Sequence, residues 1–155
     1  MELMTIGYEG LSLEEFFGLL REGRVERIVD VRQMPLSRKK GFSKNSLREA
    51  ACARGFEYIH LSAFGCPKSI RDTYKADGDW ARYTRSFLAY LVTQQEPLQH
   101  LAQIASSKRC CLLCFEADPD TCHRLFVAEH AARSSGGRLR VHHLGAAFTA
   151  PALAA

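Results

Sequence analysis

The sequence predicts an α/β fold, a three-layer sandwich built around a mostly parallel, Rossmann-like sheet of five strands. Short apolar runs alternate with helical patterns along the chain, which is the order expected of βα units. The run at 110–115 is nearly all apolar, as is typical of a central parallel strand covered on both faces. With 155 residues, 46% of them hydrophobic, the chain is long enough to bury the core of one domain. We place this domain over residues 1–146 and a small, apolar tail over 147–155.

The first elements have clear boundaries. A short apolar strand covers 3–8. Ser12 and Glu15 form a capping box that opens a helix, and Gly23 ends it. The apolar face of this helix consists of Leu13, Phe16, Phe17 and Leu20. The β-branched run at 27–31 predicts the second strand.

Turn residues and caps divide the rest of the chain. Pro35 and Gly41 mark a loop, and Ser43 or Asn45 caps a helix that ends near residue 55. A third strand follows at 56–61, and residues 63–78 read as a loop. Asp79 caps a long helix, and Pro97 suits the first turn of the next, which runs to about residue 106. After the strand at 110–115, Asp120 or Thr121 caps a helix to about residue 134, and 139–144 is the last strand.

The positive charge is concentrated in one segment. The formal net charge is +4, from 21 basic and 17 acidic residues. The segment 32–48 contains six basic residues and no acid, which leaves 15 basic against 17 acidic residues elsewhere. The segment is either a solvated basic loop or a site for phosphate or nucleic acid. For an anion site, the candidate residues beside the helix start are Arg32, Arg38, Ser43 and Lys44.

Polar residues follow the predicted strand ends, and in parallel sheets ligands gather at those ends beside a switch in strand order. Tyr8 is placed to stack on a ring or to cover the core. Asp30 closes a buried strand, so it acts either in the chemistry or in a structural ion pair. His60 shares a strand face with Tyr58 and is either a structural or a site histidine.

The densest group of reactive side chains lies between residues 114 and 124. Cys122 is expected in the first turn of a helix, where free amides and the helix dipole favour a thiolate nucleophile. His123 can hold the proton and Glu116 can act as base, with Arg124 orienting Glu116. The alternative for Cys122 is a small buried residue that packs the helix onto the sheet.

A metal site is the other interpretation of this group, because Cys114, Cys122, His123 and Glu116 are all ligand types. The spacing contains no Cys-x-x-Cys pair, and neighbouring residues on a helix point about 100° apart. We therefore assign no metal and no cofactor. The six cysteines show no disulfide framework and are expected to be free thiols.

The location is predicted from what the chain lacks. No apolar run approaches the roughly 18 residues that a membrane helix needs. The first residues have neither the basic flank nor the apolar core of a signal peptide. We expect a cytoplasmic protein with no membrane partner.

An ordered set of motifs resembles the domain-of-unknown-function 488 family over residues 4–144. The motifs are Thr5-Ile6-Gly7-Tyr8, Asp30-Val31-Arg32 with Pro35 and Ser37, Gly41-Phe42-Ser43, Tyr58-Ile59-His60-Leu61, Cys114-Phe115-Glu116, Cys122-His123-Arg124 and Val141-His142-His143-Leu144. The resemblance implies a compact bacterial or archaeal α/β domain and no assigned activity. The chain departs from the family pattern after Gly65, where the family tends to have a second glycine and this sequence has Cys66-Pro67. The resemblance implies a shared site that comprises Asp30, Arg32, Cys114, Glu116, Cys122, His123 and Arg124.

These observations lead to three functional hypotheses. The first is an enzyme with a strand-end cleft for an anionic, phosphate-bearing or nucleotide-like substrate, with Asp30 or Glu116 as acid or base. The second is a nucleic-acid-binding module that uses segment 32–48 without catalysis. The third is a metal or redox protein.

Overall fold

The computed structural model describes residues 1–145, and in this range the predicted α/β architecture is confirmed. Five parallel strands form one sheet in the order β3-β2-β4-β1-β5. They are β1 (Glu2–Gly7), β2 (Arg27–Asp30), β3 (Glu57–His60), β4 (Cys110–Cys114) and β5 (Arg140–His143). The tail expected over 147–155 lies outside the described residues.

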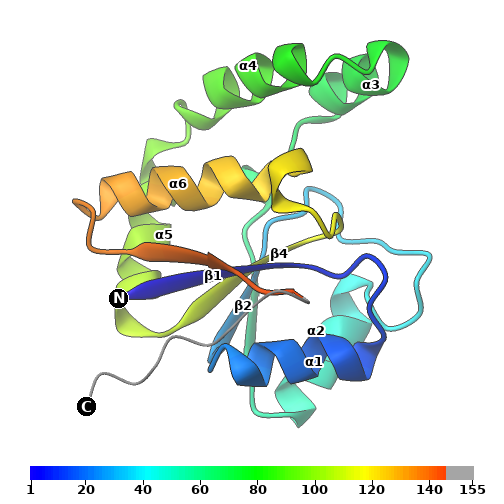
Figure 1. The fold of residues 1–155 in the computed structure, drawn as a ribbon, viewed down its shortest axis with the longest axis vertical. Coiled ribbons are helices and arrows are strands. Elements are labelled where there is room, and N and C mark those ends of the chain that lie inside the picture. Colours follow the sequence, from blue (N-terminus) through cyan, green and yellow to red (C-terminus); the bar gives the residue numbers. More distant parts are fainter. Residues whose placement is uncertain (146–155) are drawn as a thin grey trace.

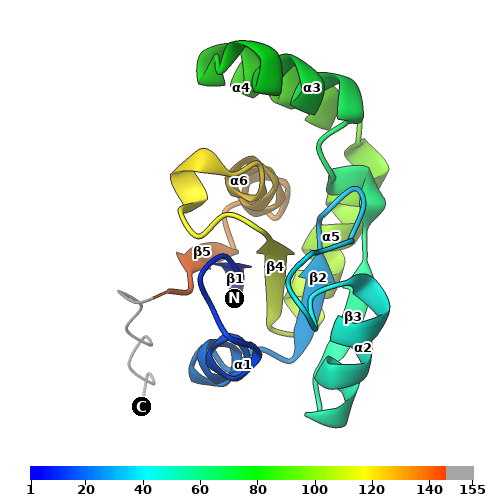
Figure 2. The ribbon, with the colours of Figure 1, turned by 90° about the vertical axis from the view of Figure 1, so that its right-hand side faces the viewer.

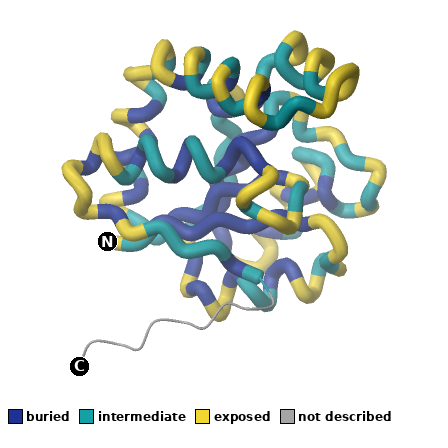
Figure 3. Tube along the Cα trace, turned by 45° about the horizontal axis from the view of Figure 1, so that its top comes forward, coloured by how far each residue is buried: buried dark blue, intermediate teal, exposed yellow. Residues whose placement is uncertain are grey.

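Helices cover both faces of the sheet, as Figures 1 and 2 show. On one face, α1 (Leu13–Glu22) and α2 (Lys44–Ala53) pack against one side of the strands. On the other face lie α5 (Gln95–Ser107) and α6 (Arg124–Ser134). The helices α3 (Lys68–Asp77) and α4 (Trp80–Leu91) extend beyond this second layer. The central strands are the most deeply buried part of the chain (Figure 3).

Two helix starts form as the sequence predicts. The Ser12 hydroxyl accepts a hydrogen bond from the Glu15 amide, and the Glu15 carboxylate accepts one from the Ser12 amide. At α4, the Asp79 carboxylate accepts from the Arg82 amide. Each cap satisfies amides that have no partner within the helix, so both boundaries are set locally.

Two local predictions are wrong, and both concern the site. Residues 63–78 are not a loop but contain a short 3-10 helix, η1 (Ser62–Phe64), followed by α3. Helix α3 has no fully buried residue and packs against the core only through the partly buried Ile70 and Tyr74, so its apolar stripe is short. Cys122 is not in the first turn of α6 but in extended backbone after a second 3-10 helix, η2 (Pro119–Thr121), and His123 is the cap of α6.

The connections explain where ligands gather. The chain runs β1, β2, β3 in one direction with α1 and α2 on one face, then returns to β4 and β5 with α5 and α6 on the other. Strand β4 thus lies between β1 and β2. The helices that follow β1 and β2, α1 and α2, cover one face of the sheet, whereas α6, which follows β4, covers the other. The switch point therefore lies at the carboxyl end of β4. Rossmann folds have the order 3-2-1-4-5-6, so the Rossmann-like assignment is not confirmed.

Among the described residues, no helix is long and apolar enough to cross a membrane.

Candidate active site at the carboxyl ends of the strands

A cleft of about 880 Å³ opens at this switch point. Its lining comes from the segments after β1, β2 and β4 on one side and from α3 and α4 on the other. The lining residues include the aromatic side chains Tyr8, Tyr74, Trp80, Tyr83 and Phe115. The sequence-based expectation of a strand-end cleft matches this position.

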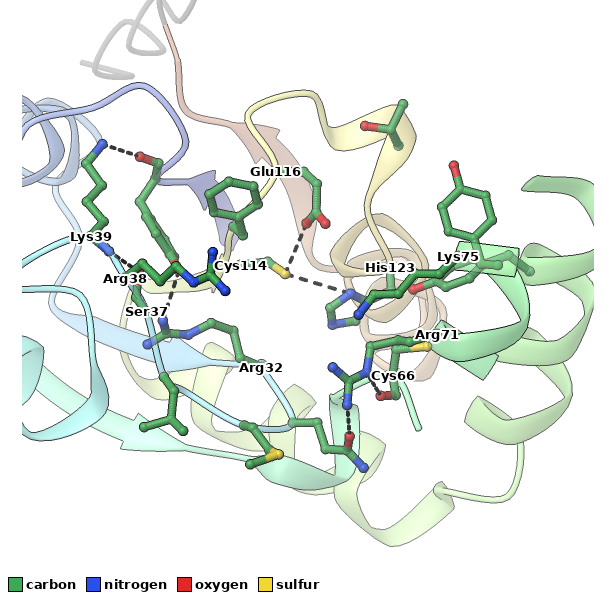
Figure 4. Close-up of a pocket in the computed structure, with 18 of the residues that line it drawn as sticks. Arg32, Ser37, Arg38, Lys39, Cys66, Arg71, Lys75, Cys114, Glu116 and His123 are labelled. Carbon is green, nitrogen blue, oxygen red and sulfur yellow. Dashed lines mark hydrogen bonds between the residues drawn. The ribbon is translucent and has the colours of Figure 1, made fainter. Parts of the chain in front are cut away.

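Positive charge dominates the cleft. The basic lining residues are Arg32, Arg38, Lys39, Arg71 and Lys75, and among the described lining residues Glu116 is the one carboxylate. Figure 4 shows Arg32, Arg38 and Lys39 on one side of Cys114 and Arg71 and Lys75 on the other. Arg71 is held in place, because its guanidinium donates to the Gln33 side chain at 2.7 Å and to the Cys66 carbonyl at 3.1 Å. A cleft with cations on both sides attracts anions.

Asp30 is fully buried and does not line the cleft, and its carboxylate instead fixes Arg32. The Arg32 guanidinium donates to both Asp30 oxygens, at 2.9 and 2.7 Å, and the Tyr58 hydroxyl donates to the second oxygen at 2.5 Å. Burial works against the charged guanidinium, but the hydrogen bonds and charge of Asp30 outweigh it and raise the pKa of Arg32. Burial and the Asp30 charge raise the pKa of Tyr58. Of the two roles predicted for Asp30, the structure shows the ion pair.

Tyr8 is a buried side chain that covers the core, with its ring stacked on Phe42 at 4.6 Å between centroids. The Arg32 guanidinium lies 5.3 Å from the Tyr8 ring centroid and donates to the hydroxyl at 3.3 Å. Phe42 therefore occupies one face of the Tyr8 ring. Tyr8 also belongs to the lining of the cleft.

Cys114, Glu116 and His123 meet in the cleft (Figure 4). The Cys114 thiol donates to the Glu116 carboxylate at 3.5 Å, and Cys114 Sγ lies 3.7 Å from His123 Nδ1. Cys122 Sγ lies 3.9 Å from the same nitrogen, although Cys122 does not line the cleft. The ligand atoms of Cys114, Cys122 and His123 all lie within 4.8 Å of one another.

The histidine tautomer follows from its other contact. His123 Nε2 lies 3.1 Å from the Val31 carbonyl oxygen, which can only accept, so Nε2 carries the proton. In the neutral ring, Nδ1 then presents its lone pair to the two sulfur atoms. Edge-on packing against Phe87, at 5.3 Å between centroids, also fixes the ring.

The cluster shifts the pKa of each of its members. Burial opposes a thiolate at Cys122, but hydrogen bonds from Cys114 and His123 outweigh it and hold the pKa well below the usual thiol value. The hydrogen bond to Cys122, together with burial, raises the pKa of Cys114. Burial opposes an imidazolium at His123, but contact with Cys122 raises its pKa. Burial and the Cys122 charge raise the pKa of Glu116. Of the two cysteines, the surroundings therefore favour the thiolate at Cys122 over the thiolate at Cys114.

Arg124 organises the loop that carries Glu116 but does not line the cleft. Its fully buried guanidinium donates to the Glu116 carbonyl at 2.5 Å, the Ala117 carbonyl at 3.2 Å and the Thr5 hydroxyl at 3.2 Å. These contacts orient Glu116 through its backbone. Because the guanidinium is fully buried and does not line the cleft, Arg124 is not placed to bind an anion there.

Three other predicted residues lie outside the cleft. Ser43 is the N-cap residue of α2, as predicted, but its hydroxyl accepts from the Ser37 amide and makes no side-chain cap hydrogen bond. Lys44 is not part of the lining. His60 Nε2 lies 2.7 Å from the Arg32 carbonyl oxygen, the structural role considered for it.

Arg71 and Lys75 are the basic cleft residues that sequence reasoning missed. They are four residues apart, so on a helix they lie on one face. The pair would have been visible if residues 68–77 had been recognised as helical. The apolar stripe of that helix is limited to Ile70 and Tyr74, and Gly78, with φ +64°, marks its end.

The comparison with known families gives one finding. The profile of a family described as "Domain of unknown function DUF488" matches residues 12–131. The chain belongs to the DUF488 family. This match confirms the resemblance that the motifs indicate, and it contains most of the cleft residues of this DUF488 protein, Tyr8 being outside it. Neither the curated proteins nor the solved structures compared with the chain gave a match.

Proposed function

We propose that this DUF488 protein is an enzyme that acts on a small anionic substrate of the phosphate-bearing or nucleotide-like class. The observation that carries the proposal is that the Cys114–Glu116–His123 cluster opens into a cleft with basic side chains on both sides. Reactive groups and anion-binding groups therefore face the same space. Clusters with shifted pKa values in a cleft are typical of active sites.

The size and lining of the cleft favour a small molecule over a polymer. A volume of about 880 Å³ falls within the range of small-molecule sites. The aromatic residues Tyr74, Trp80 and Phe115 offer apolar surface for a ring, while the basic residues offer partners for phosphate. Segment 32–48 contributes Arg38 and Lys39 to this site, which supports a localised role for its charge.

Each side of the cleft has a separate task in this proposal. Arg38, Arg71 and Lys75 bind the anionic group of the substrate. Glu116 transfers a proton at the reacting group, because its carboxylate contacts Cys114 and its pKa is raised toward the range useful for acid–base catalysis. Arg32 lines the cleft but is paired with Asp30, so its main task is to hold the β2–α2 segment.

The anion-binding part is tested by isothermal titration calorimetry with inorganic pyrophosphate and a panel of nucleoside monophosphates. Lys75→Gln and Arg38→Gln each remove one cation from the cleft, and each is expected to weaken binding roughly 10- to 100-fold, the value of a charge-assisted hydrogen bond. Lys68→Gln is the matched control for Lys75, because it changes the same charge on α3 outside the cleft. Lys40→Gln is the matched control for Arg38 in the same loop.

Two results would overturn the proposal. The first is equal weakening by the cleft and control variants, which would indicate a nonspecific electrostatic effect. The second is tighter binding of single-stranded oligonucleotides than of mononucleotides, with a steep loss of affinity as salt increases, which would support the nucleic-acid-binding alternative.

A further inference from the structure

We infer that Cys114, Cys122 and His123 bind a zinc ion at the inner end of the cleft, with an open coordination position beside Glu116. The inference deepens the proposed function by naming the reactive group of the same site. The test of zinc binding needs no substrate. Zinc binding can therefore be refuted while anion binding by Arg38 and Lys75 is confirmed, and anion binding can be refuted while zinc binding is confirmed.

The spacing of the three ligand atoms fits a tetrahedral zinc ion. Zinc–sulfur and zinc–nitrogen bonds of about 2.3 and 2.0 Å place tetrahedral S and N ligands roughly 3.6 Å apart. The distances from His123 Nδ1 to Cys114 Sγ and Cys122 Sγ are 3.7 and 3.9 Å. These two distances exceed that spacing by a few tenths of an ångström, and all three ligand atoms lie within 4.8 Å of one another.

The orientation of the histidine supports the same assignment. Metal-binding histidines usually donate their other ring N–H to a carbonyl or a carboxylate, which fixes the ring and the tautomer. His123 donates Nε2–H to the Val31 carbonyl at 3.1 Å, and this leaves Nδ1 free to bind a metal. The ring is buried against Phe87, so the nitrogen stays directed at the two sulfur atoms.

The local backbone allows Cys122 and His123 to bind one metal although they are neighbours in sequence. On a helix, which the sequence predicts here, their side chains would point about 100° apart. Cys122 is instead extended, with φ −131° and ψ 139°, and α6 starts only at Arg124. The turn before α6 thereby directs both Cys122 and His123 at Cys114, the last residue of β4. The ligands come from the strand end and from this turn, which no Cys-x-x-Cys motif would reveal.

The chemistry of the three ligand atoms favours zinc over magnesium and calcium. Two thiolates and one imidazole suit zinc, whereas magnesium and calcium prefer oxygen ligands. Two thiolates also neutralise the charge of Zn²⁺ in a place where all three side chains are buried.

Three protein ligands with one open position are typical of catalytic zinc, and structural zinc has four. Cys114 and His123 line the cleft, so an open position between them faces the substrate space. Glu116 lies beside this position, with its carboxylate 3.5 Å from Cys114 Sγ, yet it is not part of the group whose ligand atoms lie within 4.8 Å of one another. Its place suits a base that accepts a proton from a water molecule in the fourth position.

The test is metal content and cobalt spectroscopy on the purified full chain. Wild-type protein dialysed against zinc and then against metal-free buffer is expected to retain one equivalent of zinc by elemental analysis. Protein stripped with a chelator and titrated with Co²⁺ alone is expected to show the thiolate-to-cobalt charge-transfer and ligand-field absorption of a tetrahedral site. Wild-type protein that retains no zinc and gives no such absorption would overturn the inference without any variant.

Variants identify the ligands. Cys114→Ala, Cys122→Ala and His123→Ala are each expected to retain at least 10-fold less zinc than the wild type. Loss of a residue that only supports a ligand already weakens metal affinity 10- to 100-fold. Cys66→Ala is the matched control, a buried cysteine that lines the same cleft outside the cluster, and it is expected to keep one equivalent. Glu116→Gln is also expected to keep the metal. Retention by the ligand variants, or loss in Glu116→Gln, would overturn this ligand set, and circular dichroism of each variant identifies a folding defect.

Discussion

Replacing Asp30 with asparagine is expected to destabilise the protein by about 3–5 kcal/mol, the usual cost of removing one partner from a buried ion pair. The Asp30 carboxylate is fully buried and accepts from the Arg32 guanidinium twice, from the Arg32 amide and from the Tyr58 hydroxyl. An asparagine keeps one acceptor oxygen and turns an amide donor toward other donors. Arg32 then remains charged and only 6% exposed, without its counter-ion.

Equilibrium unfolding in urea measures this loss, provided that the slope of free energy against denaturant matches the wild type. Asp72→Asn is the matched control, because the Lys68–Asp72 pair is exposed and solvent-screened, and its removal is expected to leave the midpoint unchanged. Replacing Asp30 and Arg32 together, with asparagine and methionine, is expected to recover part of the lost stability, because no unpaired charge remains buried. A loss below about 1 kcal/mol in Asp30→Asn would refute the reasoning, because a buried guanidinium cannot lose its partner at so small a cost.

Two further predictions concern stability. Gly7→Ala is expected to cost about 3 kcal/mol, the upper part of the overpacking range, because an added Cβ would lie 1.7 Å from the Glu116 carbonyl oxygen. Gly18→Ala is the control, because a Cβ added at this position of α1 meets nothing within 4 Å, and it is expected to stabilise the protein by about 0.5–1 kcal/mol. Equal changes in the urea unfolding of the two variants would contradict the close approach of Gly7 to Glu116. Burial and the Arg124 charge lower the pKa of His143 below the usual histidine value of about 6.5. Because the unfolded chain then binds the proton more readily, the contribution of His143 to stability is expected to fall as pH decreases below about 6.5. His143→Gln is expected to remove this contribution, so the difference in unfolding free energy between wild type and variant should change over this pH range.

The reactive cluster shows how far the sequence leads for the site. The residue types at 114, 116, 122 and 123 are visible in the chain, and the rule for parallel sheets puts them near the strand ends. Their assignment to a nucleophile or a metal depended on the backbone at residue 122, which was expected to be helical. An Asp-Pro-Asp-Thr turn of 3-10 form, η2, delays α6 by two residues, and propensity alone does not locate such a boundary.

The basic side of the cleft shows a different limit. Segment 32–48 was recognised from charge alone, yet only part of it faces the cleft. Lys40, Lys44 and Arg48 do not line it, and Arg32, which does, is paired with Asp30. Arg71 and Lys75 come from α3, a helix that buries no residue. Its apolar stripe consists of Ile70 and Tyr74, which is too short to distinguish the helix from a loop in the sequence.

Local signals in the sequence determined the alternation of strands and helices, the caps at Ser12 and Asp79 and the buried run of β4, because these depend on neighbouring residues. Only the tertiary structure decided that β4 lies between β1 and β2, that Asp30 turns inward to Arg32, and that Cys122 and His123 meet Cys114. The physical reason is that strand order and the approach of distant side chains depend on how whole layers pack, which residues close in sequence do not encode.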